Sequence, residues 1–292
     1  SGTVTQTLTA EGAARSATGM CQDQAGNTAS NTQSGINIDK TAPTGVSLVP
    51  SGTLGNTGWY TSNVTITTTG TEAVSGPLTC TGVQSLTTDT ASATFNGSCT
   101  NLAGFTSNAA PLTLKRDATN PTITFLNRTP ANGNGWNNGD VTLNWSCTDA
   151  MSGPVDGTIT QTATAEGANQ SSTATCFDNA GNSASDTQSG INIDKTAPGI
   201  VANRTPAANA NGWNNSDVTV TFTGNDGLSG LVSCTTPVVF SAEGAGQSAT
   251  GTCADNAGNS SSATVNNINI DKTAPTATAT ASPASNSTGW NN

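Results

Sequence analysis

The acidic residues of this sequence recur at a fixed spacing, and carboxylates repeated in this way can bind calcium. Glu72, Asp149 and Asp226 are equally spaced along the chain, and a second aspartate recurs at a tight turn. Calcium takes about six to eight oxygen ligands, including backbone carbonyls, so a loop with one or two aspartates can contribute to a site. The alternative is ordinary turn chemistry, because Asp and Asn side chains cap turns without a metal. Calcium is the one cofactor considered, and its candidate ligands are Asp149, Asp178, Asp194, Asp226, Asp255 and Asp271.

Catalytic chemistry has little support in these residues. The chain contains no histidine, so it cannot assemble a Ser-His-Asp or Cys-His centre. It has no phosphate-binding loop of the Walker type. Its carboxylates return in every repeat, whereas a catalytic acid/base pair is expected once in a chain. We therefore predict that the chain is not an enzyme.

The seven cysteines are spaced as disulfide partners. Cys21, Cys99, Cys176 and Cys253 recur at the same period as the acidic residues. The middle repeat has Gly157 where the others have a second cysteine, and it carries Cys147 instead. We expect the partner of Cys21 to lie before residue 1. Zinc is the weaker alternative, because there is no His and no Cys-x-x-Cys pair. The predicted disulfides, one per complete repeat, are Cys80–Cys99, Cys147–Cys176 and Cys234–Cys253.

Disulfides of this kind form in oxidising surroundings, so the sequence predicts an extracellular or cell-surface location. Each can contribute roughly 2–4 kcal/mol to a small domain. A hydrophobic content of 33% is low for a repeat of this size, so such covalent support is expected.

One short motif, Ile-Asp-Lys-Thr-Ala-Pro, organises the chain. It ends at Pro43, Pro198 and Pro275, and a drifted copy ends at Pro121. Self-similarity at such a period indicates tandem repeats. The sequence starts and stops inside repeats, so we expect the natural chain to continue in both directions. The predicted domains are the C-terminal part of a repeat (1–43), three complete repeats (44–121, 122–198 and 199–275) and the N-terminal part of another (276–292).

Within a repeat, apolar and polar residues alternate in short runs that are typical of strands. Six or seven short strands, with turns at intervals of about 8–12 residues, predict a β-sandwich. The proline at the end of each repeat favours extended backbone, so the last strand should pass almost directly into the next repeat. The fold class is therefore all-β, with tandem sandwiches of about 77 residues forming an extended rod. In the middle repeat the expected strands are 122–126, 141–145, 158–165, 172–176 and 183–194.

Two other positions recur once per repeat, and structural roles are expected for both. A tryptophan precedes the second strand, where it can plug the core or cap the sandwich; an exposed stack of tryptophans would instead indicate sugar binding. A glycine in the tight turn indicates a positive φ. The positions are Trp59, Trp136, Trp213 and Trp290, and Gly26, Gly104, Gly181 and Gly258.

The net charge of −10 opposes binding to nucleic acid or to an anionic membrane surface, because both need basic patches. No apolar run is long enough to span a membrane, so no membrane insertion is expected from these residues. The expected partners are the neighbouring repeats of the same chain, together with other copies if the chains assemble into a filament.

The combination of Gly-Trp-x4-Val, Asp-x2-Ser-Gly, Glu-Gly, Asp-x-Ala-Gly-Asn and Ile-Asp-Lys-Thr-Ala-Pro resembles bacterial immunoglobulin-like tandem repeats. The resemblance covers the whole chain. It implies immunoglobulin-like sandwiches from a large secreted or cell-surface protein of the adhesin or fibre type. The paired cysteines and the drifted motif before Pro121 depart from the common form.

Two functions follow as hypotheses. The first is a structural segment, such as a stalk, fibre or adhesin shaft, stiffened by one disulfide per repeat. The second is a set of carbohydrate-binding or spacer repeats attached to a secreted hydrolase. Exposed tryptophans with measurable affinity for glycans would favour the second hypothesis, and buried tryptophans would favour the first.

Overall fold

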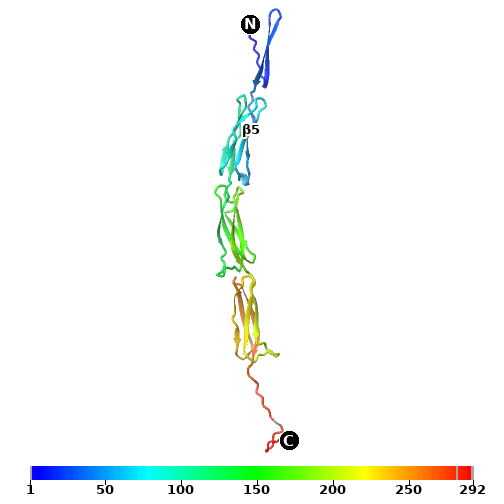
Figure 1. Ribbon diagram of the computed structural model, residues 1–292, viewed down its shortest axis with the longest axis vertical. Coiled ribbons are helices and arrows are strands. Elements are labelled where there is room, and N and C mark those ends of the chain that lie inside the picture. Colours follow the sequence, from blue (N-terminus) through cyan, green and yellow to red (C-terminus); the bar gives the residue numbers. More distant parts are fainter. Residues whose placement is uncertain (1, 281, 291–292) are drawn as a thin grey trace. The chain divides into compact units, whose positions relative to one another are not determined.

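The structure is a computed structural model that describes residues 2–280 and 282–290. It is built from β-strands (Figure 1). Among the described residues the one helical element is a single 3₁₀ turn, η1 (Asn56–Gly58). That part of the chain contains no helix with the length and hydropathy needed to cross a membrane. The predicted all-β class, with small sheets in tandem, is therefore confirmed.

The chain divides into two compact units. One comprises Ser1–Leu126, Asn144–Thr160 and Ala174–Asp186, and the other comprises the remaining segments. Repeat 44–121 lies within the first unit and repeat 199–275 within the second, whereas repeat 122–198 contributes segments to both. The repeat boundaries drawn from the sequence remain a prediction.

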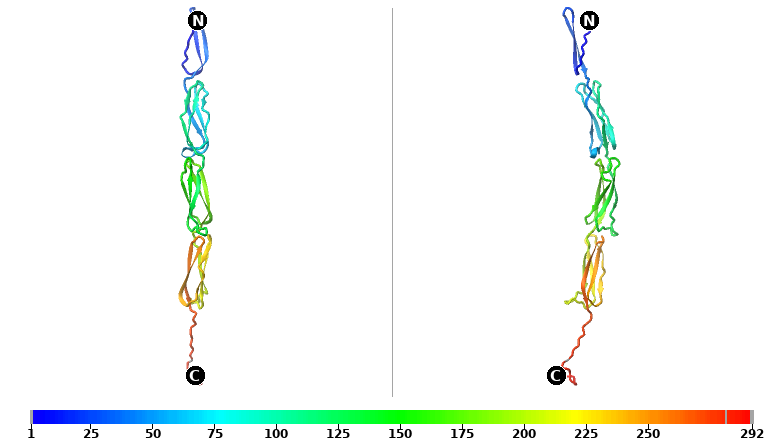
Figure 2. Two further views of the ribbon diagram at one scale, coloured as in Figure 1. Left: turned by 90° about the vertical axis from the view of Figure 1, so that its left-hand side faces the viewer. Right: turned by 180° about the vertical axis from the view of Figure 1, so that it is seen from behind.

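Repeat 199–275 shows the sandwich most simply. Its six strands form two sheets, with the orders β17-β18-β20 and β19-β21-β22. The long hairpin strands of this repeat appear in orange tones in both views of Figure 2. The strands are β17 (Gly199–Thr205), β18 (Val218–Asn225), β19 (Leu231–Cys234), β20 (Val238–Phe240), β21 (Gly244–Asp255) and β22 (Ser260–Ile270).

Repeat 44–121 has three sheets, because its long hairpin is interrupted. Pro111 cannot donate to a ladder, and it separates two strands where β22 is continuous. Asn96 and Gly97 interrupt the other arm. The sheet orders are β3-β5-β7, β10-β9-β6 and β4-β11-β8. The strands are β3 (Thr44–Ser51), β4 (Trp59–Tyr60), β5 (Val64–Thr71), β6 (Thr79–Cys80), β7 (Gln84–Leu86), β8 (Thr90–Phe95), β9 (Ser98–Thr100), β10 (Thr106–Asn108) and β11 (Leu112–Arg116).

Repeat 122–198 has five strands in two sheets, ordered β12-β13-β14 and β15-β16, so the expectation of six or seven was wrong here. The strand expected at 172–176 begins at Gly167 instead. Within the added part of the strand, Asn169 adopts a φ of 53°, and its N–H donates to Oδ1 of Asn192 at 2.7 Å. The strands are β12 (Thr122–Arg128), β13 (Val141–Thr148), β14 (Thr158–Ala163), β15 (Gly167–Phe177) and β16 (Ser183–Ile193).

The terminal segments are simpler. Segment 1–43 contains one antiparallel hairpin, β1 (Gly12–Gln22) with β2 (Thr28–Ile38). The described residues of segment 276–292 form no strand.

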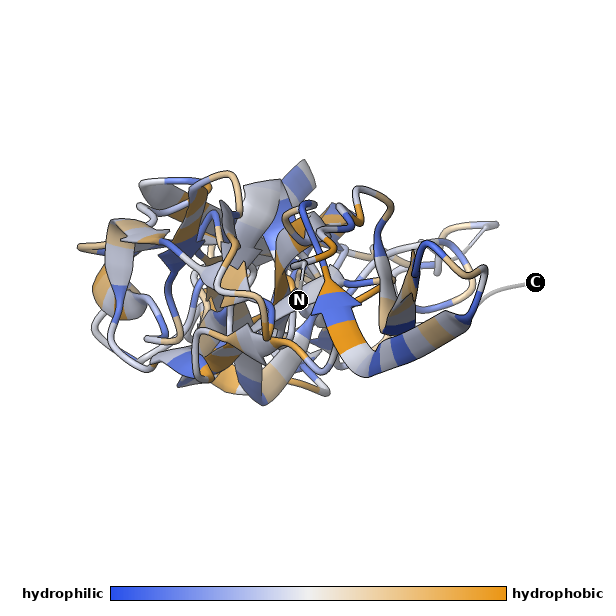
Figure 3. Cartoon of the chain, turned by 90° about the horizontal axis from the view of Figure 1, so that it is seen from above, coloured by the Kyte–Doolittle hydropathy of each residue, from blue (hydrophilic) through white to orange (hydrophobic). Residues whose placement is uncertain are grey.

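The core of each repeat lies between its sheets. In repeat 199–275, Val218 and Val220 of one sheet meet Ile268 and Ile270 of the other. Buried and more exposed residues alternate along these strands, and Figure 3 shows hydrophobic and hydrophilic residues mixed on the same ribbons. The isoleucines of the repeated motif are buried in the last two complete repeats, as predicted, whereas Ile36 and Ile38 of segment 1–43 are half-buried. This packing confirms the β-sandwich.

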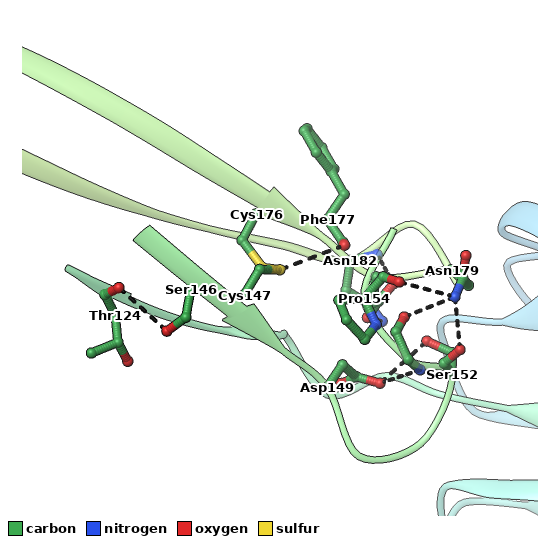
Figure 4. The surroundings of a disulfide bond; sticks show 12 residues. Thr124, Ser146, Cys147, Asp149, Ser152, Pro154, Cys176, Phe177, Asn179 and Asn182 are labelled. Carbon is green, nitrogen blue, oxygen red and sulfur yellow. Dashed lines mark hydrogen bonds between the residues drawn. A yellow bond between two sulfur atoms is a disulfide. The ribbon is translucent and has the colours of Figure 1, made fainter. Parts of the chain in front are cut away.

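The three disulfides form two kinds of link. Cys80–Cys99 and Cys234–Cys253 each join directly paired residues of neighbouring antiparallel strands, with Cα atoms 4.0 Å apart. Cys147–Cys176 joins β13 to β15, which belong to different sheets (Figure 4). Its Cα atoms are 5.8 Å apart. The middle repeat is thus bridged across its sheets, and the other two within one sheet.

A glycine explains how the bridge changed position. A Cβ placed on Gly224 would lie 2.9 Å from the Sγ of Cys253 and 3.0 Å from the Sγ of Cys234. Cys147 occupies the position of Gly224 one period earlier. The sulfur atoms therefore fill similar space in both arrangements, reached from a different strand.

Candidate functional site

The repeats meet at short joints that begin with an aspartate. The first joint (39–43) lies between β2 and β3, the second (117–121) between β11 and β12, and the third (194–198) between β16 and β17. Each joint has five residues, so the expectation of an almost direct passage between strands fits this length. Each joint lies within one compact unit.

The first residue of a joint bonds to both repeats. The backbone N–H of Asp194 donates to the carbonyl of Asn137 at 2.9 Å, within its own repeat. Its Oδ2 accepts the N–H of Ser229, in the next repeat, at 3.0 Å. Asp117 makes the same two bonds. Its N–H donates to the carbonyl of Tyr60 at 2.9 Å, and its Oδ2 accepts the N–H of Ser152 at 3.0 Å. One side chain therefore links successive repeats.

An asparagine in the tight turn returns this contact. Nδ2 of Asn259 donates to the carbonyl of Asp194 at 2.9 Å and to Oδ2 of Asp255 at 2.8 Å. Asn182 bonds to the carbonyl of Asp117 and to Asp178 in the same way. The turn between the last two strands is thereby attached to the preceding repeat.

A second line of contact runs through the loop before the periodic tryptophan. The N–H of Asn56 donates to the carbonyl of Ala180 at 2.8 Å, and the Thr57 hydroxyl donates to the carbonyl of Asn179 at 2.9 Å. A Cβ on Gly55 would lie 2.2 Å from the carbonyl oxygen of Ala180, so only glycine fits there. Two separate contact points resist bending better than one.

The corresponding loop of repeat 122–198 contacts the next repeat in a related way. The side chains of Asn132 and Asn134 donate to the carbonyl of Asn256 at 2.8 and 3.2 Å. This line of contact therefore occurs at both the second and the third joints.

A glutamate that the sequence analysis did not single out fixes the start of the joint. Oε1 of Glu166 accepts the N–H of Lys195 at 2.6 Å and the hydroxyl of Thr196 at 3.0 Å. Glu11 and Glu243 do the same in their segments. The recurring Glu-Gly pair was available as a signal, but it served only as one of the motifs of the family resemblance.

At the second joint, Asp89 replaces the glutamate. It accepts the N–H of Ala118 and the hydroxyl of Thr119, and it pairs with Arg116 at 2.5 Å. Burial raises the pKa of Asp89, but these bonds and the Arg116 charge outweigh it, and the pKa lies below its usual value.

Three carboxylates converge at each of two joints. In each group, one oxygen atom per residue lies within 4.8 Å of the others, and two of the three residues are buried. The ion pairs of the described residues involve Asp89, Asp140 and Asp217, and none of these belongs to either group. The groups are Asp117, Asp149 and Asp178 at the second joint, and Asp194, Asp226 and Asp255 at the third.

The donor set of these groups fits a hard divalent cation such as calcium, which prefers carboxylate and carbonyl oxygens. Five of the six candidate residues predicted from sequence lie in the two groups. Asp117, which recurs in sequence at the same joint position as Asp194, completes one of them, although it was not among the six candidates. Asp271 belongs to neither group; its Oδ1 accepts the N–H of Thr273 at 3.0 Å. Calcium binding itself remains a prediction.

The first joint has a different composition. Here Asn101 stands at the position of Asp178, and Glu72 at that of Asp149. Nδ2 of Asn101 donates to Oδ2 of Asp39 at 2.9 Å and to Oε2 of Glu72 at 3.0 Å. The same nitrogen donates to the carbonyl of Thr41 at 3.0 Å. An amide thus bridges the two carboxylates.

Hydrogen bonds stabilise the charged forms of both carboxylates at the first joint. The hydroxyl of Ser75 and the N–H of Thr41 hold the pKa of Asp39 below its usual value. The N–H of Val74 and the amide of Asn101 lower the pKa of Glu72, against burial and the charge of Asp39. Both groups are therefore ionised at neutral pH.

The periodic tryptophans have unequal surroundings. Trp59 is 8% exposed, with the Nζ of Lys115 4.9 Å from its ring centroid. Trp136 is half-buried, Trp213 is 38% exposed and Trp290 is 75% exposed. The fully buried tryptophan is Trp145, which sequence periodicity did not single out because it occurs in one repeat.

The glycines of the tight turns have similar conformations. Gly26, Gly104, Gly181 and Gly258 have φ values of 90°, 90°, 103° and 97°. A side chain would be strained at each of these positions.

No protein-family model and no curated protein matches this sequence. Among solved structures, one similar chain is a Ca²⁺-stabilised adhesin that helps an Antarctic bacterium to bind ice. It is 16% identical, with a TM-score of 0.33, and the match covers 88% of this chain and 81% of that chain. A second is from a 1.5-MDa bacterial ice-binding adhesin, 15% identical with a TM-score of 0.29, covering 72% and 91%. This all-β chain is therefore similar, over most of its length, to solved structures of bacterial ice-binding adhesins.

Proposed function

We propose that this chain is a structural segment of a long extracellular or cell-surface protein, serving as a stalk, fibre or adhesin shaft. The observation that carries the proposal is the bonding at the joints, where one aspartate belongs to the hydrogen-bond network of two successive repeats. Asp194 bonds to Asn137 behind it and to Ser229 ahead of it. Such joints transmit orientation from one repeat to the next.

The disulfides support the extracellular location, because bonds of this kind persist in oxidising surroundings. They also supply stability that small sandwiches with a modest apolar core need. The proposed role needs no catalytic group, which agrees with a chain that contains no histidine.

The test is the distribution of angles between repeats in electron micrographs of the whole chain. Asn259→Ala removes the bonds from Nδ2 to Asp194 and Asp255. Asn266→Ala, at an exposed position of β22, is the matched control. We expect straight particles for the native chain and the control, and a wider angle distribution at the third joint for Asn259→Ala. Native particles that bend freely at every joint would refute the proposed role.

The second candidate function, carbohydrate binding by the repeats, is favoured by one observation, the 38% exposure of Trp213. It predicts that Trp213→Ala abolishes binding to a glycan array. Trp59 cannot serve in the same way, because it is buried and Lys115 covers its ring. Native protein that binds no glycan would remove this alternative.

A further inference from the structure

Each complete repeat contains a short parallel pairing immediately before its end. In repeat 44–121, β4 pairs in parallel with β11, and Trp59 and Tyr60 lie opposite Lys115 and Arg116. In the other two repeats it is a parallel bridge, Asn137 with Ile193 and Asn214 with Ile270. All other strand pairs with a described register are antiparallel.

Two backbone hydrogen bonds hold the bridge of the middle repeat. The N–H of Asn137 donates to the carbonyl of Asn192 at 3.0 Å, and the N–H of Asp194 donates to the carbonyl of Asn137 at 2.9 Å. Repeat 199–275 has the same pair of bonds, with Asn214, Asn269 and Asp271, at 2.9 and 3.0 Å. The last bond ends at the aspartate that begins the next joint.

This arrangement determines how tension acts on a repeat. In a chain of repeats, tension pulls the earlier member of the parallel pair (β4, Asn137 or Asn214) toward the N-terminus. It pulls the last strand of the repeat toward the C-terminus. Two parallel segments pulled in this way slide along each other, so their hydrogen bonds are loaded together. A hairpin opened at one end would instead lose its bonds one at a time.

The disulfides then determine how far an opened repeat can extend. Cys80–Cys99 and Cys234–Cys253 each exclude 19 residues from extension, and Cys147–Cys176 excludes 29. The joint aspartates recur at the common period of the repeats, so the repeats have nearly the same length. If no disulfide closed a loop in them, all of them would therefore release nearly the same length of chain. The middle repeat has the larger closed loop, and it therefore releases less chain than either neighbour.

We propose that the chain bears tension along its length, with the parallel pairing as the element that resists it and the disulfides as limits on extension. The inference rests on the proposed structural role and adds a mechanical property to it. The two disulfide positions give extensions of two sizes. The middle repeat opens about 3–4 nm less than its neighbours, at roughly 3.3–3.6 Å per residue.

The test is single-molecule force spectroscopy of the whole chain, held at its two ends, with and without a reducing agent. We expect abrupt events of two lengths in the oxidised chain. Reduction should lengthen two events by about 6 nm and the middle event by about 10 nm, at roughly 3.3–3.6 Å per residue. Equal event lengths in the oxidised chain, or extension without abrupt events, would overturn the proposal.

The role of the pairing is tested in the middle repeat, whose shorter event identifies it. Asn137→Pro removes the N–H that donates to Asn192, while Asn137→Ala keeps it and removes the same side-chain bond to Pro130. We expect the opening force of Asn137→Pro to fall by roughly a third to a half relative to Asn137→Ala, because loaded bonds share the tension. Equal forces would overturn the proposal.

If Asn137→Pro shows no middle event because that repeat does not fold, Asn214→Pro against Asn214→Ala decides the question in repeat 199–275. Electron microscopy of the same chains separates the two proposals. Straight particles that extend without abrupt events would remove the mechanical inference and leave the structural role intact.

Discussion

Removal of divalent cations is expected to loosen the second and third joints and to leave the first unchanged. The second and third joints each bring three carboxylates together. At the first joint, the amide of Asn101 takes the place of the third carboxylate and donates to both Asp39 and Glu72. The chain therefore contains its own control for the effect of a cation.

The structure gives the size of the effect. The carboxylate oxygens lie within 4.8 Å of one another, and two unit charges at that upper limit repel by about 3.5 kcal/mol at an effective dielectric constant near 20. Three carboxylates form three such pairs, so the repulsion is on the order of 10 kcal/mol if all are ionised. That is comparable with the whole stability of a small domain, roughly 5–15 kcal/mol. A divalent cation among the carboxylates replaces this repulsion by attraction.

The assay is hydrogen exchange of the whole chain, measured by mass spectrometry with calcium and with a chelator. The backbone N–H groups of Ser152 and Asn182 bond to carboxylates of the second joint. We expect them to exchange at least about tenfold faster without cations, since roughly 1.4 kcal/mol of lost protection gives that factor. The N–H groups of Val74 and Phe105, which bond to Glu72 and Asn101 at the first joint, should not respond.

Exchanging the two kinds of joint sharpens this test. Asn101→Asp should make the first joint sensitive to chelation. Asp178→Asn combined with Asn182→Phe should make the second joint insensitive, because Phe105 occupies the equivalent of Asn182 at the first joint. The second change is needed because Nδ2 of Asn182 donates to the carboxylate of Asp178 at 2.8 Å. In Asp178→Asn, the side-chain amide nitrogen would face Nδ2 of Asn182, and two donors cannot bond to each other.

Two results would refute the reasoning. Identical exchange with and without cations at all three joints would show that the carboxylates are not held by a metal. Faster exchange at the first joint in the chelator, to the same extent as at the others, would show that the amide of Asn101 does not replace a cation.

Three further predictions concern stability. Trp145→Phe removes an indole N–H that donates to a carboxylate at 2.7 Å, and should lower the unfolding free energy by about 2–4 kcal/mol in urea titrations; a loss under about 1 kcal/mol would contradict this. Cys147→Ser with Cys176→Ser opens a 29-residue loop and should destabilise by about 3–4 kcal/mol in the same assay, whereas no change would contradict the entropic account. The hydroxyl of Ser75 lowers the pKa of Asp39 in the folded protein. The charged Asp39 therefore stabilises the first joint at pH values above the pKa that this carboxyl has in the unfolded chain. This contribution is lost as pH falls through the folded value, so the protection of the amides there, measured relative to the intrinsic exchange rate at each pH, should fall below about pH 4, and less so in Ser75→Ala.

The period of the sequence, together with its apolar alternation, was sufficient to predict the class of fold. Strand identity followed from alternation, and the motif isoleucines at 191, 193, 268 and 270 lie in the core. The extra length of β15 was not predictable in this way. It depends on a bond from Asn169 to Asn192, 23 residues away, and local alternation carries no information on such a contact.

The joints were predictable in position and only partly in composition. Recurring aspartates, Asp117 among them, indicated which residues gather there, but Asp117 was not included among the candidate ligands. The exchange of a carboxylate for Asn101 looks conservative in sequence. Only its three hydrogen bonds show that it changes an acceptor into a donor at the centre of the joint.

The disulfide connectivity has a consequence for biosynthesis. Each of the three bonds joins a cysteine to the next cysteine along the chain: Cys80 to Cys99, Cys147 to Cys176, and Cys234 to Cys253. A chain that enters an oxidising compartment N-terminus first presents the members of each pair in succession, before the following pair emerges. Cys21 emerges before all of them and is unpaired among the described residues. Oxidation in order of emergence therefore yields the three bonds directly when Cys21 has already been paired with an earlier cysteine. Such a chain can grow by adding repeats without increasing its need for disulfide isomerisation.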